Sequence, residues 1–225
     1  MNYSERKVLP NFYKARTEIE HMLILTCLFS IALIIFRMVY TGTITYLSMV
    51  WNLFLAFIPY AITQWLIGYP HKKNRALFFA ACFIWLLFIP NSFYILTDLF
   101  HLDQHKNMPL WYDLALLFSC AWNGLMFGIL SVRQMEIVFQ RFYAPKFDLL
   151  FLYPVMLLNA LGVYLGRFLR FNSWDIFTNP FYLIRDIIYL FIHPLHYRVD
   201  WSMIICYSVL MTLIYVTIKK LGRSL

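Results

Sequence analysis

Charged side chains are scarce in this chain. Asp, Glu, Lys and Arg make up 13% of its 225 residues, whereas an ordinary soluble domain contains about 25%. Hydrophobic residues make up 62% of the chain and aromatic residues 20%. This balance excludes an ordinary water-soluble domain and predicts a protein whose solvent is lipid, with many rings at the membrane interfaces. The length suits one helical bundle and leaves no room for a soluble catalytic domain.

Several motifs are also missing. The sequence contains no P-loop, no Gly-rich nucleotide fingerprint and no G-x-S-x-G element, so no ATP-driven motor is predicted. The four cysteines lie apart in apolar stretches without a C-x-x-C pair, which favours small buried side chains over disulfides or zinc ligands. The net charge of +8 lies mostly in short loops, so membrane topology explains it better than nucleic-acid binding.

What the sequence does contain is a series of long hydrophobic stretches. Each has about the twenty residues that a helix needs to cross the hydrocarbon core. The six stretches are residues 21–40, 45–68, 76–99, 110–132, 149–169 and 201–218. They predict an all-α fold, a polytopic membrane bundle of six transmembrane helices. The bundle is expected to form one domain over residues 21–220, flanked by a basic cytoplasmic tail (1–20) and a short tail (221–225).

A further apolar stretch, residues 176–192, is interrupted by Asn179, Pro180, Arg185 and Asp186. Charge in the middle of a membrane is costly, so this stretch is predicted to be an interfacial or re-entrant helix. The alternative is a seventh span with an internal Arg185–Asp186 pair, which would place the C-terminus outside.

The basic residues indicate the orientation of the bundle. In the six-span arrangement, thirteen Lys and Arg fall on the side of the two termini and six fall on the other side. Positive charge gathers on the cytoplasmic side of membrane proteins, so both chain ends are predicted to be cytoplasmic.

Polar residues gather at the predicted outer face, which holds every aspartate except Asp148 and four of the six histidines. Helical spacing places four residues of the third stretch on one helix face, namely Asn91, Tyr94, Asp98 and His101. Three other stretches have similar faces. The residues are Asp113, Cys120 and Asn123 in the fourth stretch, Asn52, Pro59 and Thr63 in the second, and Asn159, Gly166 and Arg170 in and just after the fifth. A charge that faces lipid is costly, so these faces are expected to point inward or to line a wet cavity.

The chemistry of these residues suggests a site. Asp98, His101 and Asp113 are the candidates for acid–base catalysis, in which a carboxylate orients an imidazole. A divalent metal is the alternative, since carboxylate and imidazole suit zinc or iron, and its candidate ligands are Asp98, His101 and His105.

Other polar residues are candidates for substrate binding, namely Asn91, Tyr94, Asn123, Arg167 and Arg170. The two arginines suit an anionic group such as a lipid phosphate. Structural roles are the alternatives: asparagines in membrane helices hydrogen-bond to neighbouring helices, and arginines extend to the interface. Two Gly-x-x-x-Gly pairs, Gly124 with Gly128 and Gly162 with Gly166, are expected to bring helices close together.

Longer motifs resemble a known family. They are Trp51-Asn52 with Pro59-Tyr60, the stretch Trp85 to His101 with Pro90-Asn91, Trp111-Tyr112-Asp113 with Trp122-Asn123-Gly124, and Gly166-Arg167-x-x-Arg170-Phe-Asn172-Ser173-Trp174-Asp175. This pattern is similar to the bacterial membrane proteins filed as domain of unknown function 1361. The resemblance implies a multi-span protein of the bacterial cytoplasmic membrane, and it implies no activity.

Two functions fit these observations. The first is a membrane enzyme that acts at the outer face on a lipid or lipid-linked substrate. The second is a transporter, or an accessory or structural subunit of a membrane complex, although the sequence lacks the internal repeat of many transporters. The depth of the polar region distinguishes them, because an enzyme site should stop near the outer third of the bundle while a transport path should continue towards Thr63.

Overall fold

The computed structural model describes residues 3–68, 74–102, 107–140 and 148–224, and these segments are helical with no strand among them. The chain order of the helices is α1 (Tyr3–Thr41), α2 (Ser48–Gly68), α3 (Arg75–Tyr94), the 3-10 helix η1 (Ile95–His101), α4 (Leu110–Gln140), α5 (Asp148–Arg167), α6 (Asp175–Thr178), α7 (Pro180–Ile192) and α8 (Arg198–Ser224).

The lengths of these helices confirm a helical membrane protein. Five helical segments are long and apolar enough to cross a membrane, and a sixth, Phe151–Arg167, is apolar but shorter. The predicted interfacial stretch forms α6 and α7. With 13 residues, α7 is about 20 Å long, too short to cross a hydrocarbon core of about 30 Å. Helix α4 continues through residues 133–140, beyond the end predicted for the fourth span.

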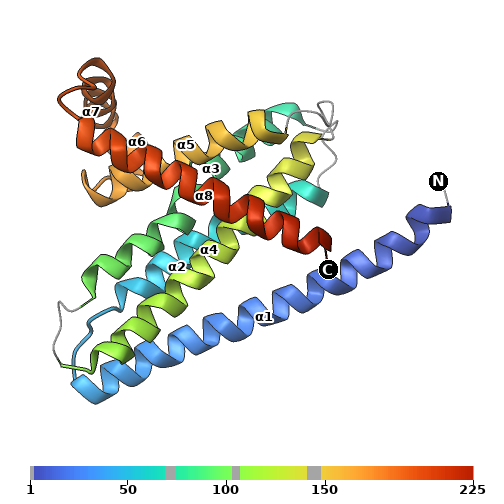
Figure 1. Cartoon of the computed structure of the whole chain (residues 1–225), viewed down its shortest axis with the longest axis horizontal. Helices are drawn as coiled ribbons and strands as arrows, with labels where there is room; N and C mark the ends of the chain where they lie inside the picture. Colours follow the sequence, from blue (N-terminus) through green and yellow to red (C-terminus); the bar gives the residue numbers. More distant parts are fainter. Residues whose placement is uncertain (1–2, 69–73, 103–106, 141–147, 225) are drawn as a thin grey trace.

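The helices form two packed groups (Figure 1). Helices α2, α3 and α4 pack against one another, and α1 runs along α4. Helix α5 packs on α3 and on α8, which crosses the first group steeply in Figure 1. The ends of α1 and α8 that carry the chain termini lie on the same side of the molecule. This arrangement places α5 beside α3, and the candidate site lies where these two helices face α2.

The predicted glycine motifs are confirmed as close-packing positions. A Cβ atom on Gly162 would lie 2.5 Å from Cγ of Pro90, and one on Gly124 would lie 2.7 Å from the carbonyl oxygen of Ser92. Both distances are too short for a side chain. Glycine therefore lets α5 and α4 approach α3 on opposite sides, as small residues do in membrane bundles.

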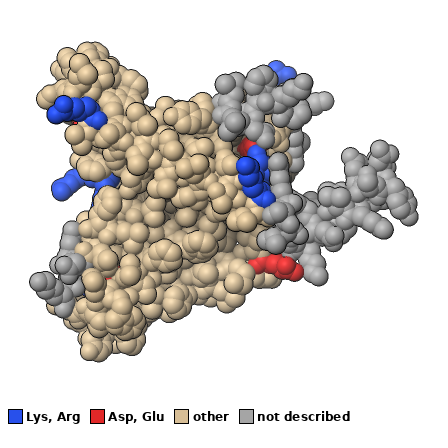
Figure 2. Space-filling model, viewed as in Figure 1, with Lys and Arg blue, Asp and Glu red and all other residues tan. Residues whose placement is uncertain are grey.

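Each end of the bundle holds a buried carboxylate. The Asp98 end comprises η1, the ends of α1 and α5, and the beginnings of α2, α4 and α8. The Glu136 end comprises the beginnings of α1, α3 and α5 and the ends of α2, α4 and α8. In Figure 2 the charged side chains in view lie at the left and right margins of the molecule, with an uncharged band between them. Such a band is what a lipid bilayer requires of the surface that it covers.

Candidate functional site

Helix α3 tightens into η1 just before the Asp98 end. A 3-10 helix has three residues per turn, so Asp98 and His101, three residues apart, project on the same side of η1. The side chains of Tyr94, Asp98 and His101 all meet Arg167 of α5, and that of Asn91 meets Ser173. The four residues predicted to share a helix face therefore do point towards one neighbouring segment.

Arg167 is the centre of this cluster. Its Nη1 atom donates to Oδ1 of Asp98 at 3.2 Å, and its Nη2 atom lies 2.7 Å from Nε2 of His101. A guanidinium group only donates hydrogen bonds, so Nε2 of His101 is the acceptor and the proton of the neutral ring is on Nδ1. The carboxylate of Asp98 is buried, and its Oδ2 atom accepts a hydrogen bond of 3.1 Å from Asn52.

Two aromatic rings complete the surroundings of Arg167. Its guanidinium carbon lies 5.9 Å from the ring centre of Tyr94 and 5.7 Å from that of Phe100, distances at which a cation is attracted to a ring. Arg167 thus has a carboxylate, an imidazole and two rings as partners. This arrangement holds the ends of α3 and α5 together, and both terminal nitrogens of the guanidinium, where the predicted lipid phosphate would bind, have partners within the chain.

A cavity of about 310 Å³ lies beside the cluster, between α2, α3, α5 and the segment that follows α5. Asn52 and Tyr94 belong both to the wall of the cavity and to the cluster, since Asn52 donates to Asp98 and Tyr94 contacts Arg167. The ion pair is therefore one side chain away from the cavity.

On α2 and α3 the wall of the cavity changes from polar to apolar along the bundle axis, whereas the lining residues of α5 are leucines and glycines throughout. Its polar lining residues lie at the Asp98 end and are Asn52, Asn91, Tyr94, Asn172 and Ser173. Its deeper apolar lining residues include Leu55, Leu86, Leu87, Leu158 and Leu161. In α2 the apolar residues follow the polar ones and in α3 they precede them, and these two helices run in opposite directions. Both helices thus place the apolar wall nearer the middle of the bundle.

The loop after α5 brings Asn172 and Ser173 to the cavity. Oδ2 of Asp175 accepts the backbone N–H of Asn172 at 2.6 Å, and this hydrogen bond lowers the pKa of the Asp175 carboxyl. Ser173 accepts a hydrogen bond of 2.8 Å from Asn91 and donates one to the carbonyl of Leu87. The loop is thereby fixed against α3.

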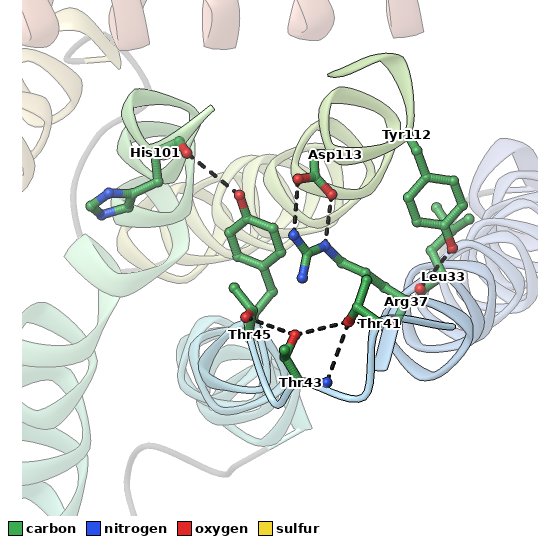
Figure 3. A network of polar contacts seen from close by, with 9 residues as sticks. Leu33, Arg37, Thr41, Thr43, Thr45, His101, Tyr112 and Asp113 are labelled. Carbon is green, nitrogen blue, oxygen red and sulfur yellow. Dashed lines mark hydrogen bonds and ion pairs between the residues drawn. The ribbon is translucent and has the colours of Figure 1, made fainter. Parts of the chain in front are cut away.

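Asp113 belongs to a second cluster (Figure 3). Both of its carboxylate oxygens accept hydrogen bonds from Arg37 of α1, at 2.7 and 3.0 Å, and both side chains are buried. The ring of Tyr46 lies 4.6 Å from the guanidinium carbon, and its hydroxyl donates to the carbonyl of His101 at 3.4 Å. Burial raises the pKa of the Tyr46 phenol, which favours its donor form. Asp113 thus pairs with α1, and Tyr46 links this pair to η1.

Asn123 faces α1 as well. Its amide accepts a hydrogen bond from Thr26 at 2.6 Å and donates to Ser30 at 2.9 Å. These contacts hold α1 against α4, the structural alternative for membrane asparagines. Arg170 has a positive φ of 60° and an exposed side chain, and it is not part of the lining of the cavity.

The described residues also bear on the metal hypothesis. Among them, no three His, Cys, Asp or Glu side chains are close enough together to hold a metal ion. The cation beside Asp98 and His101 is the guanidinium of Arg167, which would repel a metal at that position. His105, the third predicted ligand, lies outside the described residues.

The Glu136 end holds a cluster that the sequence analysis missed. Glu136 of α4 is buried and accepts hydrogen bonds from Tyr215 at 2.5 Å, from Arg133 and from Lys219. These contacts tie α8 to α4. The signal in the sequence is an acidic residue between basic segments at the end of an apolar stretch, but its partner α8 is 79 residues away from it at Tyr215.

Comparison with known proteins adds one match. A family model described as "Protein of unknown function (DUF1361)" matches residues 51–216. This range contains the lining of the cavity, Asp98, His101 and Arg167, and it begins after Arg37 and Tyr46. No curated protein and no solved structure matches the chain.

Proposed function

This chain belongs to the family described as protein of unknown function (DUF1361), and we propose that it binds a lipid or lipid-linked substrate in the cavity and presents the head group to Asp98 and His101. The observation that carries this proposal is the polarity gradient that α2 and α3 give the cavity wall, with amides and a hydroxyl at the Asp98 end and leucines towards the middle of the bundle. A lipid has the same gradient, with a polar head at the interface and chains in the core.

The cluster beside the cavity supplies groups for acid–base chemistry. Arg167 covers Oδ1 of Asp98 and Nε2 of His101. If the contact between Arg167 and these two side chains opens when a ligand binds, both atoms are exposed, a carboxylate and an imidazole that can accept and return a proton. The ion pair would then act as a closed state of the site.

The proposal includes an orientation. In the six-span arrangement thirteen Lys and Arg belong to the side of the chain ends, which is the Glu136 side, and six to the Asp98 side, and positive charge favours the cytoplasmic side. We place the Asp98 end outside and both chain ends inside a bacterial cytoplasmic membrane, with six spans. The cavity would then open in the outer half of the bundle.

The depth of the cavity favours an enzyme or binding site over a transport path. Thr63 and Ser131 lie further along the bundle, where Thr63 donates to Gln134 at 2.7 Å and Trp85 donates to Ser131 at 2.8 Å. None of these four residues is part of the lining of the cavity. Between the two regions lie packed apolar side chains such as Ile89.

Filling the cavity should remove the bound lipid. Leu158 lies on the cavity wall and is 46% exposed, so Leu158→Trp can place an indole in the cavity at little cost to the core. We expect wild-type protein, purified in mild detergent, to retain a lipid in native mass spectrometry and the variant to lose it. Leu213→Trp, on an α8 position that is 60% exposed and outside the lining, is the matched control. Equal lipid retention in all three proteins would contradict the proposed binding site.

Enzymatic conversion of the lipid head group is tested in a separate experiment. Wild-type protein reconstituted with total membrane lipid is expected to convert one lipid species, followed by liquid chromatography and mass spectrometry. His101→Ala should lower the rate of conversion at least a hundredfold, since a positioned acid–base group contributes about 10²–10⁴-fold, while the Asp98–Arg167 pair maintains the fold. Lipid binding without conversion in wild type would refute the enzymatic part, and movement of lipid between leaflets would indicate transport instead.

A further inference from the structure

The lining of the cavity is uncharged. Of the lining residues that the structure describes, none is Asp, Glu, Lys or Arg. The nearest cation on α5, Arg167, is not part of the lining and already has Asp98 and His101 as partners. An anionic head group that entered this cavity would lose water without gaining a free opposite charge, which is costly.

The polar wall has the chemistry of a site for hydroxyl groups. It contains three amide side chains, Asn52, Asn91 and Asn172, and the hydroxyls of Tyr94 and Ser173. Asn91 donates to the carbonyl of Phe88 and to Ser173, and Asn52 donates to Asp98. The amide oxygens on this wall are acceptors, which suit the O–H donors of a ligand. A phosphate would instead favour a set of donors, and charged ones in particular.

An aromatic ring stands at the rim of this wall. Trp51, in the first turn of α2, lines the cavity and is 52% exposed. It is packed on one side by Phe54, with ring centres 5.4 Å apart, so the indole is held in place while part of it stays uncovered. A fixed indole beside amides can cover the apolar C–H face of a sugar ring while the amides bond its hydroxyls.

We infer that the head group bound in the cavity is neutral and rich in hydroxyls, the sugar of a glycolipid or of a lipid-linked saccharide. The inference rests on the proposed function, because it specifies the ligand of the same cavity. The volume of about 310 Å³ lies at the small end of ligand pockets, which span roughly 300–1,000 Å³. It therefore favours one sugar ring at the polar wall, with the lipid chain continuing along the leucines.

A pair of probes with the same chain separates sugar from phosphate. Dodecyl glucoside and dodecyl phosphate are titrated into delipidated protein held in amphipols, and binding is followed by native mass spectrometry. We expect the glucoside to bind at least tenfold more tightly than the phosphate. Tighter binding of the phosphate would overturn the inference and leave the proposed cavity intact.

Three variants make the result specific. Trp51→Ala is expected to weaken binding of the glucoside at least fivefold and to leave binding of the phosphate unchanged, whereas Trp51→Phe should retain most of the affinity for the glucoside. Because Trp51 is half exposed, these variants should fold, as melting temperatures would verify. Leu158→Trp should abolish binding of the glucoside. If neither probe binds, or if Leu158→Trp binds both as wild type does, the proposed function fails together with the inference.

Discussion

Replacing Arg37 with leucine is expected to lower the free energy of unfolding by about 3–5 kcal/mol, because removing one partner of a buried ion pair leaves the other charge uncompensated. Arg37 is 0% exposed and Asp113 is 2% exposed, so water cannot replace the lost partner without opening the contact between α1 and α4. Reversible unfolding in mixed micelles measures the change.

The double variant Arg37→Leu/Asp113→Leu is the decisive control. Apolar side chains of similar volume often replace a buried ion pair at no net cost, so we expect most of the lost stability to return. The cation–π contact with Tyr46 is also removed in the double variant, which limits the recovery. Equal stability of the wild type and the single variant would show that the pair is not buried in the membrane-embedded protein.

The Arg37–Asp113 pair is also linked to η1, through Tyr46. Tyr46 contacts Arg37 through its ring and the carbonyl of His101 through its hydroxyl. The Arg37–Asp113 pair therefore supports the end of η1 without touching the cavity. Asp113 was predicted as a catalytic residue. In the structure it is paired with Arg37 and does not line the cavity.

The fold was predictable because lipid leaves a chain few alternatives. A membrane-spanning segment must satisfy its own backbone hydrogen bonds over about twenty apolar residues, and this requirement sets both the class of fold and the approximate helix limits. The charges of Arg185 and Asp186 indicated that the stretch around them does not span, and α7 is a short helix. The extension of α4 to Gln140 was not predictable from hydrophobicity, since nothing apolar is required beyond the core.

The sequence predicted at which end of the bundle the candidate site lies, but it did not predict which neighbouring helix each polar face contacts. Spacing alone placed Tyr94, Asp98 and His101 on one helix face, and one arginine of α5 meets all three. Spacing does not reveal towards which neighbour a face points. Asp113 was grouped with Asp98 because both lie at the same end of the bundle, whereas its helix turns it towards α1 and Arg37.

The role of Arg167 and the cluster at Glu136 show a second limit. Arg167 was predicted as a binder of anions, but its closest partners are groups of the chain itself. Glu136 pairs with Lys219 of α8, a residue distant in sequence. Partners of this kind follow from tertiary packing, so a single sequence shows the charges without showing how they neutralise one another.

Replacing Asp98 with leucine is expected to lower the free energy of unfolding by about 3 kcal/mol or more, because Arg167 would keep its charge in a largely buried position with only neutral partners. The variant also leaves the amide of Asn52 without the acceptor at 3.1 Å. Thermal melting in detergent gives the sign of the effect and unfolding in mixed micelles gives its size. Arg198→Leu, at an exposed position of α8, should change stability by less than about 1 kcal/mol.

The double variant Asp98→Leu/Arg167→Leu then separates stability from function. An apolar replacement of the whole pair should recover most of the stability, so its lipid binding and conversion can be compared with those of the wild type at equal folding. If Asp98 and Arg167 serve only to join α3 and α5, the stable double variant will bind and convert lipid as the wild type does. If they form the closed state of a reactive site, the double variant will retain the lipid, because the cavity wall is unchanged, and will lose its conversion. The second outcome is the one that the contacts of Arg167 with both Asp98 and His101 lead us to expect.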